Sequence, residues 1–369
     1  MNLQKLFSAA LVRTGWCIFL LSLLNFSHTL PTAWAQSPLP LGSVSGITQL
    51  HTCPAGYFTG ASCFEATVSC PNTLDIQVTY GLTNPVGIPR GMVALFGGAG
   101  GTQPYGSGTQ EQTFSSNYVQ AGYQIVQQAW ASDWEDTGIT NGKNVKTAAC
   151  RPATLLNFFH QTLYQGDGGM CAQGASAGSA ALAYSLSWYG SSNYLDKVEL
   201  LSGPVLSDIE QGCEVPDAPP VTVCAAGQFG CDGAAWIDKP QYVQGTQIGV
   251  GRWSGLQCQQ GSRTPLATNS TWKTMSIVDG TNGASLFYPQ TAMAGWLCSN
   301  GENNSAAEGQ IFYRQFTSAA QTAKYSLTRI DGCAGPEGVD AGKTPSGESG
   351  FVAITTDMTD SVAGCIKRH

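Results

Sequence analysis

The chain has 369 residues, of which 42% are hydrophobic and only 11% are charged, and its formal net charge is −7. An acidic chain with 17 Lys and Arg residues lacks the basic surface that binds nucleic acid through its phosphates, which excludes that class of partner. The apolar content is sufficient for a packed core, so the chain is predicted to be globular and not disordered.

The first 35 residues have the pattern of a secretory signal peptide. Lys5 and Arg13 precede an apolar run at 16–24, and the sequence AWA at 33–35 matches the small-x-small cleavage pattern. The run is too short for a membrane span, and no later stretch is long enough for one. We therefore predict cleavage before Gln36 and a secreted or periplasmic protein.

Cysteine usage indicates the same compartment. Thirteen cysteines are present, and twelve remain once Cys17 is removed with the signal peptide. An even number in an exported chain predicts up to six disulfides, although the sequence does not give their pairing. Because no CxxC pair occurs and the chain has only four histidines, we predict no metal site and no cofactor.

From residue 67 onward the sequence alternates between strand-like and helical patterns. Strands are predicted at 75–80, 91–96, 124–130, 169–173, 198–202, 291–297 and 326–330. Helices are predicted at 151–164, 177–188, 306–316 and 350–362. The alternation predicts an α/β fold in which helices flank a mostly parallel sheet.

The same pattern sets the expected domain boundaries. Residues 36–66 are predicted to be an N-terminal leader, and residues 67–203 and 291–369 are predicted to be two parts of one α/β domain. Residues 204–290 interrupt the rhythm, because they contain many turn residues and little periodicity. An insertion of this length predicts a lid or binding region. Four cysteines are available to staple it with disulfides: Cys213, Cys224, Cys231 and Cys258.

One motif carries chemistry. Residues 174–178 read Gly-Ala-Ser-Ala-Gly and match the Gly-x-Ser-x-Gly pattern, which by itself is weak evidence in a chain with 45 glycines. The setting strengthens it, because a predicted strand leads into the motif and a predicted helix leaves it. A Ser at this turn presents its hydroxyl at a helix N-terminus, where the dipole favours developing negative charge. Ser176 is therefore the predicted nucleophile.

With this motif, and with the Gly-rich segment 96–101 (FGGAGG) after an early strand, the chain resembles the α/β-hydrolase superfamily, specifically its exported, Cys-rich, esterase-like members. The resemblance covers about three quarters of the chain. It implies an α/β-hydrolase-like fold with a lid and attack by Ser176 on a small-molecule or polymeric ester. It also implies an oxyanion hole made of the N–H of Ala177 and one from Gly98 or Ala99.

The acid that this family uses is expected after the penultimate strand, 291–297. The loop there offers Glu302 in place of the usual Asp. Asp208, just beyond the strand at 198–202, and Asp279 are the alternatives. The sequence leaves these three candidates open.

The family's His is missing from its expected place. The loop after the last predicted strand, 326–330, contains Glu337 but no His, and the only His downstream of Ser176 is His369. A closing helix at 350–362 runs for about 20 Å and ends at the sheet edge opposite the nucleophile. Five further residues span at most about 18 Å, which disfavours a return. Either His369 folds back, or Glu337 replaces it, or no base exists.

Two functions follow from these residues. The first is a secreted serine hydrolase that acts on carboxylic esters with a non-standard or degenerate triad. The second is a catalytically silent α/β-hydrolase-like protein that binds a ligand or a surface polymer, because a His normally takes the proton from the Ser. Neither function involves nucleic acid or a membrane span.

Overall fold

The computed structural model describes residues 37–85, 87–105, 109–138, 144–166, 168–201, 203–204, 206–209, 273–278, 283–298, 309, 311–316, 321–330 and 364–369. The predicted signal peptide, most of the predicted insertion and the predicted helix at 350–362 lie outside these residues. No helix in the described ranges is both long and apolar enough to cross a membrane.

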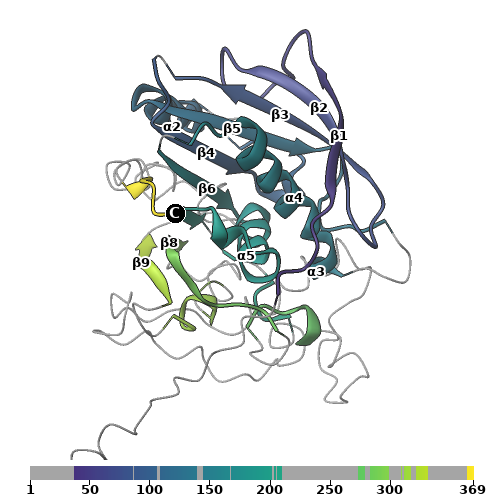
Figure 1. Cartoon of the computed structure of the whole chain (residues 1–369), viewed down its shortest axis with the longest axis vertical. Coiled ribbons are helices and arrows are strands. Elements are labelled where there is room, and N and C mark those ends of the chain that lie inside the picture. The colour runs from purple at the N-terminus through teal and green to yellow at the C-terminus, as the bar shows by residue number, and fades with distance from the viewer. Residues whose placement is uncertain are drawn as a thin grey trace, which may run out of the picture. The chain divides into compact units, whose positions relative to one another are not determined.

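A nine-stranded sheet organises the described chain (Figure 1). Its strands are β1 (Ser43–Gln49), β2 (Ser62–Ser69), β3 (Ile76–Thr83), β4 (Gly91–Phe96), β5 (Tyr123–Trp130), β6 (Gly169–Ala175), β7 (Lys197–Leu201), β8 (Tyr288–Cys298) and β9 (Thr322–Ile330). The spatial order is β1-β2-β3-β5-β4-β6-β7-β8-β9. The strands β5, β4, β6, β7, β8 and β9 pair in parallel in this order, whereas β1, β2, β3 and β5 pair antiparallel. The predicted α/β fold with a mostly parallel sheet is confirmed, and each of the seven predicted strands is present.

Within the segment predicted as a leader, residues 36–66, the structure has the strand β1 and the beginning of β2, both in the sheet. β1 pairs with β2 from Ser43↔Ser69 to Gln49↔Phe64, with an irregularity between Ser45 and Thr48. β1 is an edge strand whose side chains are almost all exposed, so it lacks the apolar alternation that marks a strand in sequence. The domain therefore begins before residue 67.

Helical segments connect the strands: η1 (Ala99–Gly101), α2 (Thr109–Gln120), α3 (Val145–Ala148), α4 (Cys150–Phe158), η2 (Phe159–Leu163, a π-helical turn), α5 (Ala177–Tyr189) and η3 (Ser191–Asn193). The helix predicted at 151–164 thus continues from α4 into η2. The helix predicted at 177–188 is α5. Of the helix predicted at 306–316, only residues 309 and 311–316 are described, and 309 and 311–313 are helical.

The two faces of the sheet pack against different helices. On β4, Met92, Ala94 and Phe96 belong to a core shared with α3, α4 and α5. The alternate residues, Val93 and Leu95, belong to a second core with α2. Side chains alternate along a strand, so one strand serves both layers. All thirteen residues of α5 are buried, and an Ala-rich helix that is apolar on every side fits this position.

Three disulfides connect the described part of the chain: Cys53–Cys63, Cys70–Cys150 and Cys171–Cys365. They account for half of the twelve cysteines that follow the predicted signal peptide. Cys298 ends β8, and the remaining five lie outside the described residues, including the four predicted to staple the insertion. The predicted disulfide framework is confirmed for these three pairs.

Candidate active site

Ser176 lies in the turn between β6 and α5, and its backbone is strained. Its φ is 51° and its ψ is −114°, a combination that L-residues rarely adopt. The Ser176 N–H donates to the Leu201 carbonyl at 2.9 Å, which joins the turn to the end of β7. The side chain is 9% exposed and stands at the N-terminus of α5. This strand–turn–helix turn, which we call the elbow, lies at the carboxyl edge of the parallel strands and is the setting that the Gly-x-Ser-x-Gly motif requires.

The two glycines of the motif are required by close contacts between backbones. A Cβ on Gly174 would lie 2.4 Å from the Gly178 carbonyl oxygen. A Cβ on Gly178 would lie 2.3 Å from the carbonyl oxygen of Phe96, at the end of β4. Any side chain at either position would therefore push α5 away from the strands, and Ser176 would move with it.

A residue that the sequence did not indicate, Ser179, holds the turn from inside. Its Oγ lies 2.6 Å from the Gly174 carbonyl oxygen and 2.7 Å from that of Leu201. Ser179 is fully buried, so its hydroxyl acts as structural support for the elbow. In the sequence, only its position three residues after Ser176, in the first turn of α5, could have indicated this supporting role.

The Gly-rich segment after β4 lies against the start of α5. Besides Phe96, the Gly97 carbonyl oxygen lies 2.8 Å from where a Cβ on Gly178 would be. Gly98 precedes η1, and its carbonyl accepts the Gly101 N–H at 2.8 Å. The first N–H groups of a helix have no intrahelical acceptor, which applies to Ala177. The structure thus brings the segment that contains Gly98 and Ala99 to the helix end that contains Ala177.

His369 lies at the opposite edge of the sheet. Its Nε2 is 3.2 Å from the Leu195 carbonyl oxygen, and its N–H donates to Asp196 Oδ1 at 3.2 Å. The β6–β7 register places Leu195 level with Gly169, seven residues before Ser176. At about 3.3 Å per residue, the two ends of the strand are about 20 Å apart. The hypothesis that His369 folds back to Ser176 is therefore wrong.

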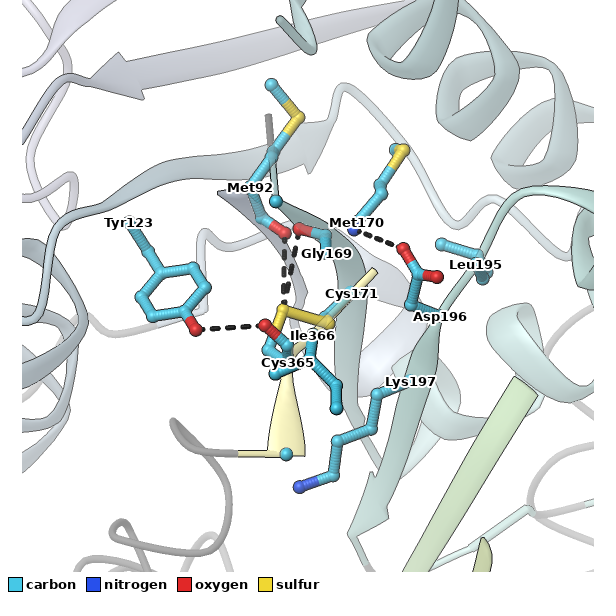
Figure 2. Close-up of a disulfide and its surroundings, with 12 residues drawn as sticks. Met92, Tyr123, Gly169, Met170, Cys171, Leu195, Asp196, Lys197, Cys365 and Ile366 are labelled. Carbon is cyan, nitrogen blue, oxygen red and sulfur yellow. Dashed lines mark hydrogen bonds between the residues drawn. A yellow bond between two sulfur atoms is a disulfide. The ribbon is translucent and has the colours of Figure 1, made fainter. Parts of the chain in front are cut away.

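The physical cause is the anchoring of the C-terminal segment (Figure 2). The Cys171–Cys365 disulfide ties residues 364–369 to the beginning of β6. The Tyr123 hydroxyl donates to the Cys365 carbonyl at 2.9 Å, and Asp196 also accepts the Met170 N–H at 2.8 Å. These contacts hold the last residues at the amino ends of the strands.

The other described histidines also lie away from the elbow. The ring of His160, on η2, stacks on Tyr194 with 4.6 Å between ring centroids. Burial lowers the pKa of His160, an effect that Asp196 opposes and His369 reinforces, so His160 shares the amino edge with them. His51 is exposed and follows β1, the edge strand that β2, β3, β5 and β4 separate from β6. Within the described ranges, no histidine accompanies Ser176.

Only one of the predicted acids can be placed. Asp208 is half-buried in the segment after β7, which leaves the sheet at the same edge as Ser176. Next to it, the Ile209 N–H donates to Ser276 Oγ at 2.9 Å, and the Tyr184 hydroxyl of α5 lies 2.9 Å from the Leu206 carbonyl oxygen. The other candidates, Asp279, Glu302 and Glu337, lie outside the described residues.

A buried ion pair lies on β7, the strand that pairs with β6. Lys197 Nζ and Glu199 Oε1, both on β7, are 2.6 Å apart, and Glu199 is 3% exposed. Glu199 is the register partner of Gln173 on β6, whose amide is also buried. The strand sequence KVELL contains both charges, but no local pattern indicates that they are buried.

Comparison with known proteins shows similarity in fold. No protein-family model matches the chain, and no curated protein matches it. Among solved structures, it is similar to an acetyl xylan esterase from Paenibacillus sp. R4, at 10% identity over 89% of this chain and 90% of that chain, with a TM-score of 0.51. It is also similar to acetyl xylan esterase 1 from Thermoanaerobacterium sp. JW/SL YS485, at 13% identity over 86% and 88%, with a TM-score of 0.50.

Sequence identities of 10% and 13% establish a similarity of fold alone. The mostly parallel sheet and its helical layers agree with these matches in fold. The chain therefore has the α/β-hydrolase fold.

Proposed function

We propose that this protein is an exported ester hydrolase in which Ser176 is the nucleophile. The observation that carries the proposal is the strained backbone of Ser176. Ser176 stands at the N-terminus of a fully buried helix whose Gly178 lies against the carbonyls of Phe96 and Gly97. Strain of this kind persists only where the surroundings enforce it, and it is concentrated at functional sites. The acetyl xylan esterases of similar fold support an acyl ester as the substrate class.

In the proposed reaction, Ser176 Oγ attacks the ester carbonyl carbon while its proton passes to a base. The carbonyl oxygen becomes an oxyanion that accepts hydrogen bonds from the N–H of Ala177 and one of Gly98 or Ala99. The tetrahedral intermediate collapses, the alcohol leaves with the proton, and an acyl-Ser176 ester remains. Water, deprotonated by the same base, then releases the carboxylic acid and regenerates the hydroxyl.

The base in this proposal is a carboxylate, because the described histidines lie away from Ser176: His160 and His369 at the amino ends of the strands, and His51 beside the edge strand β1. β8 and β9 run parallel to β6, so both strands end at the edge where Ser176 lies. Glu302 follows Cys298 by four residues and Glu337 follows Ile330 by seven, which allows reaches of up to about 14 and 25 Å. A Glu has an ordinary pKa of about 4.3, so it is a weak base at neutral pH unless desolvation raises that value. Slow turnover is expected.

A second function is favoured by the same placement of the histidines. With His51, His160 and His369 all away from the elbow, a catalytically silent protein that binds a ligand or a surface polymer fits the described residues. The two functions differ in one property, the reactivity of Ser176.

Labelling with a fluorophosphonate probe, followed by identification of the modified peptide, tests this property. An activated Ser176 is labelled, and Ser176→Ala abolishes both labelling and short-chain ester hydrolysis. The free energy of unfolding should change by no more than about 1 kcal/mol, because a single hydroxyl contributes little to packing. Hydrolysis that survives in Ser176→Ala would rule out the assignment.

A second set of variants identifies the base. Glu337→Gln and Glu302→Gln remove the two candidate carboxylates at almost constant shape, and Asp208→Asn removes the one predicted acid that the structure describes. His369→Ala is the matched control, which we expect to leave labelling unchanged because of its distance from Ser176. An unlabelled wild-type protein would favour the silent binding protein.

A further inference from the structure

A cavity of about 490 Å³ opens on one face of the sheet, over β2, β3 and β5. Its floor includes Glu65, Gln77 and Thr79, and its walls are the loop 54–57 and the segment 102–104. We call it the β3 groove. Ser176 is not among the residues that line it.

The walls of the β3 groove are fixed before any ligand binds. The fully buried amide of Gln127 accepts the Phe58 N–H at 2.6 Å and donates to the Tyr105 carbonyl at 2.5 Å, so one side chain holds both walls. The Tyr57 hydroxyl donates to the Thr79 carbonyl at 2.8 Å. The Cys53–Cys63 disulfide closes the first wall. A preformed groove lowers the entropic cost of binding.

The chemistry of the β3 groove favours an uncharged ligand rich in hydroxyl groups. Its polar side chains are amides and hydroxyls, and its one charged lining residue is Glu65, a carboxylate. Burial raises the pKa of Tyr57, so its hydroxyl stays neutral as well. With no cation among the described residues of the lining, an anionic ligand would face Glu65 without a counter-charge.

Apolar lining atoms accompany these polar groups. Pro54, Ala55, Pro104, Ala129 and Ala131 also line the β3 groove. A surface that alternates polar and apolar patches suits a sugar ring, which has hydroxyls at its rim and C–H groups on its faces. A peptide strand is a poorer fit, because β2, β3 and β5 are paired on both sides and offer no free edge.

The β3 groove and the elbow lie on two sides of one loop. The loop begins with Gly97, whose carbonyl oxygen lies beside Gly178, and continues to Thr102 in the groove wall. Five residues separate these points, which limits their distance to about 18 Å. The loop is held on the segment that follows β5, because the Trp134 N–H donates to the Gly100 carbonyl at 3.1 Å.

We propose that the β3 groove binds a neutral oligosaccharide chain. In the proposed ester hydrolase, on which this part rests, that chain is the alcohol portion of the substrate, and its acyl group reaches Ser176 across the loop 97–104. The binding site itself does not depend on the reactivity of Ser176.

The test is calorimetric titration of the full mature protein with xylohexaose, cellohexaose and mannohexaose. We expect saturable binding of at least one of them. Gln77→Ala, which removes an exposed amide from the floor, should raise its Kd about tenfold. Ala131→Trp, which fills the β3 groove from an exposed position, should raise it at least as much. Gln49→Ala, on the exposed edge strand β1, is the matched control and should leave the Kd unchanged.

Hexagalacturonate and a Gly-Ser hexapeptide serve as anionic and peptide comparators, and both should bind at least about tenfold more weakly. Absence of neutral oligosaccharide binding, equal binding by the groove variants, or preference for either comparator would overturn the proposal. Hydrolysis of p-nitrophenyl acetate is measured on the same samples. Groove-dependent binding without hydrolysis supports the β3 groove and rejects only the esterase, whereas hydrolysis without binding rejects only the β3 groove.

Discussion

At the scale of single residues, the elbow depends on backbone contacts so close that they exclude a larger side chain. The Ser176 conformation costs on the order of 1–3 kcal/mol, which its neighbours must offset. The Ser176 N–H, the Ser179 hydroxyl and the Leu201 carbonyl together fix the turn on β7. Gly178 then sets the distance between α5 and β4. The position of Ser176 is therefore determined by backbone packing more than by its own side chain.

Gly178→Ala tests this argument. Ala has the higher helix propensity by about 1 kcal/mol, so propensity alone predicts a more stable protein. Because the new Cβ would lie 2.3 Å from the Phe96 carbonyl oxygen, we expect instead a loss of about 1–3 kcal/mol, as in other overpacked sites. Thermal melts measure the stability, and probe labelling reports whether the Gly-rich segment has moved.

Gly166→Ala is the control for a generally disturbed backbone. Gly166 has a φ of 87°, and among the described residues no atom beyond its chain neighbours lies within 4 Å of the place that a methyl group would take. This variant therefore adds backbone strain without a steric contact with them. It should lower the melting temperature slightly and leave labelling intact. A Gly178→Ala protein as stable as wild type would show that the contact between β4 and α5 does not hold the elbow.

At the scale of secondary-structure elements, α4 is held by a buried cation. The Arg151 guanidinium donates to the carbonyls of Leu74 at 2.6 Å and Trp134 at 3.0 Å, and to that of Asp136. Arg151 is 1% exposed, and its burial lowers its pKa, an effect that Asp136 and Asp75 oppose. One side chain thus joins α4 to the loops before β3 and after β5.

Arg151→Met keeps most of the volume and removes every donor. Because three carbonyls then lose a common partner in a buried place, we expect the free energy of unfolding to fall by about 3 kcal/mol. Arg151→Lys should recover part of this loss, since an ammonium group cannot reproduce the planar fork. Urea denaturation with the disulfides intact measures both variants. Arg90→Met, at an exposed position, should change stability by less than about 0.5 kcal/mol; an equal loss there would contradict the assignment.

At the scale of the whole molecule, disulfides close loops of very different length. Cys171–Cys365 spans 194 residues, Cys70–Cys150 spans 80 and Cys53–Cys63 spans 10. In the chain-entropy description, the stabilisation grows with the logarithm of loop length. The Cys171–Cys365 disulfide also keeps His369 at the amino ends of the strands.

Replacing each pair by two serines should therefore destabilise the protein in that order, by about 5, 4.5 and 3 kcal/mol. Thermal and urea unfolding of the three double-serine variants measure the ranking. Removal of Cys171–Cys365 should not create labelling that depends on His369, because Asp196 still holds that segment. If removal of Cys53–Cys63 were the most harmful, loop closure would not be the main source of stability.

The sequence by itself determined the elements whose pattern is local. Seven strands with apolar cores, the Ala-rich helix and the Gly-x-Ser-x-Gly turn were predicted because periodicity and turn chemistry act over a few residues. From these followed the α/β class and Ser176 as the candidate nucleophile. β1, β2 and α2 were not predicted. The exposed edge strand β1 and the polar helix α2 carry little apolar alternation.

Only the tertiary structure decided which distant residues meet. Nothing in the sequence showed that Cys171 pairs with Cys365, and this pairing fixes the last residues at the edge opposite Ser176. The β3 groove likewise needs β2, β3, β5 and two loops, which the chain order scatters from Pro54 to Ala131. Contacts between segments far apart in sequence depend on the global packing of the sheet, which no local pattern encodes.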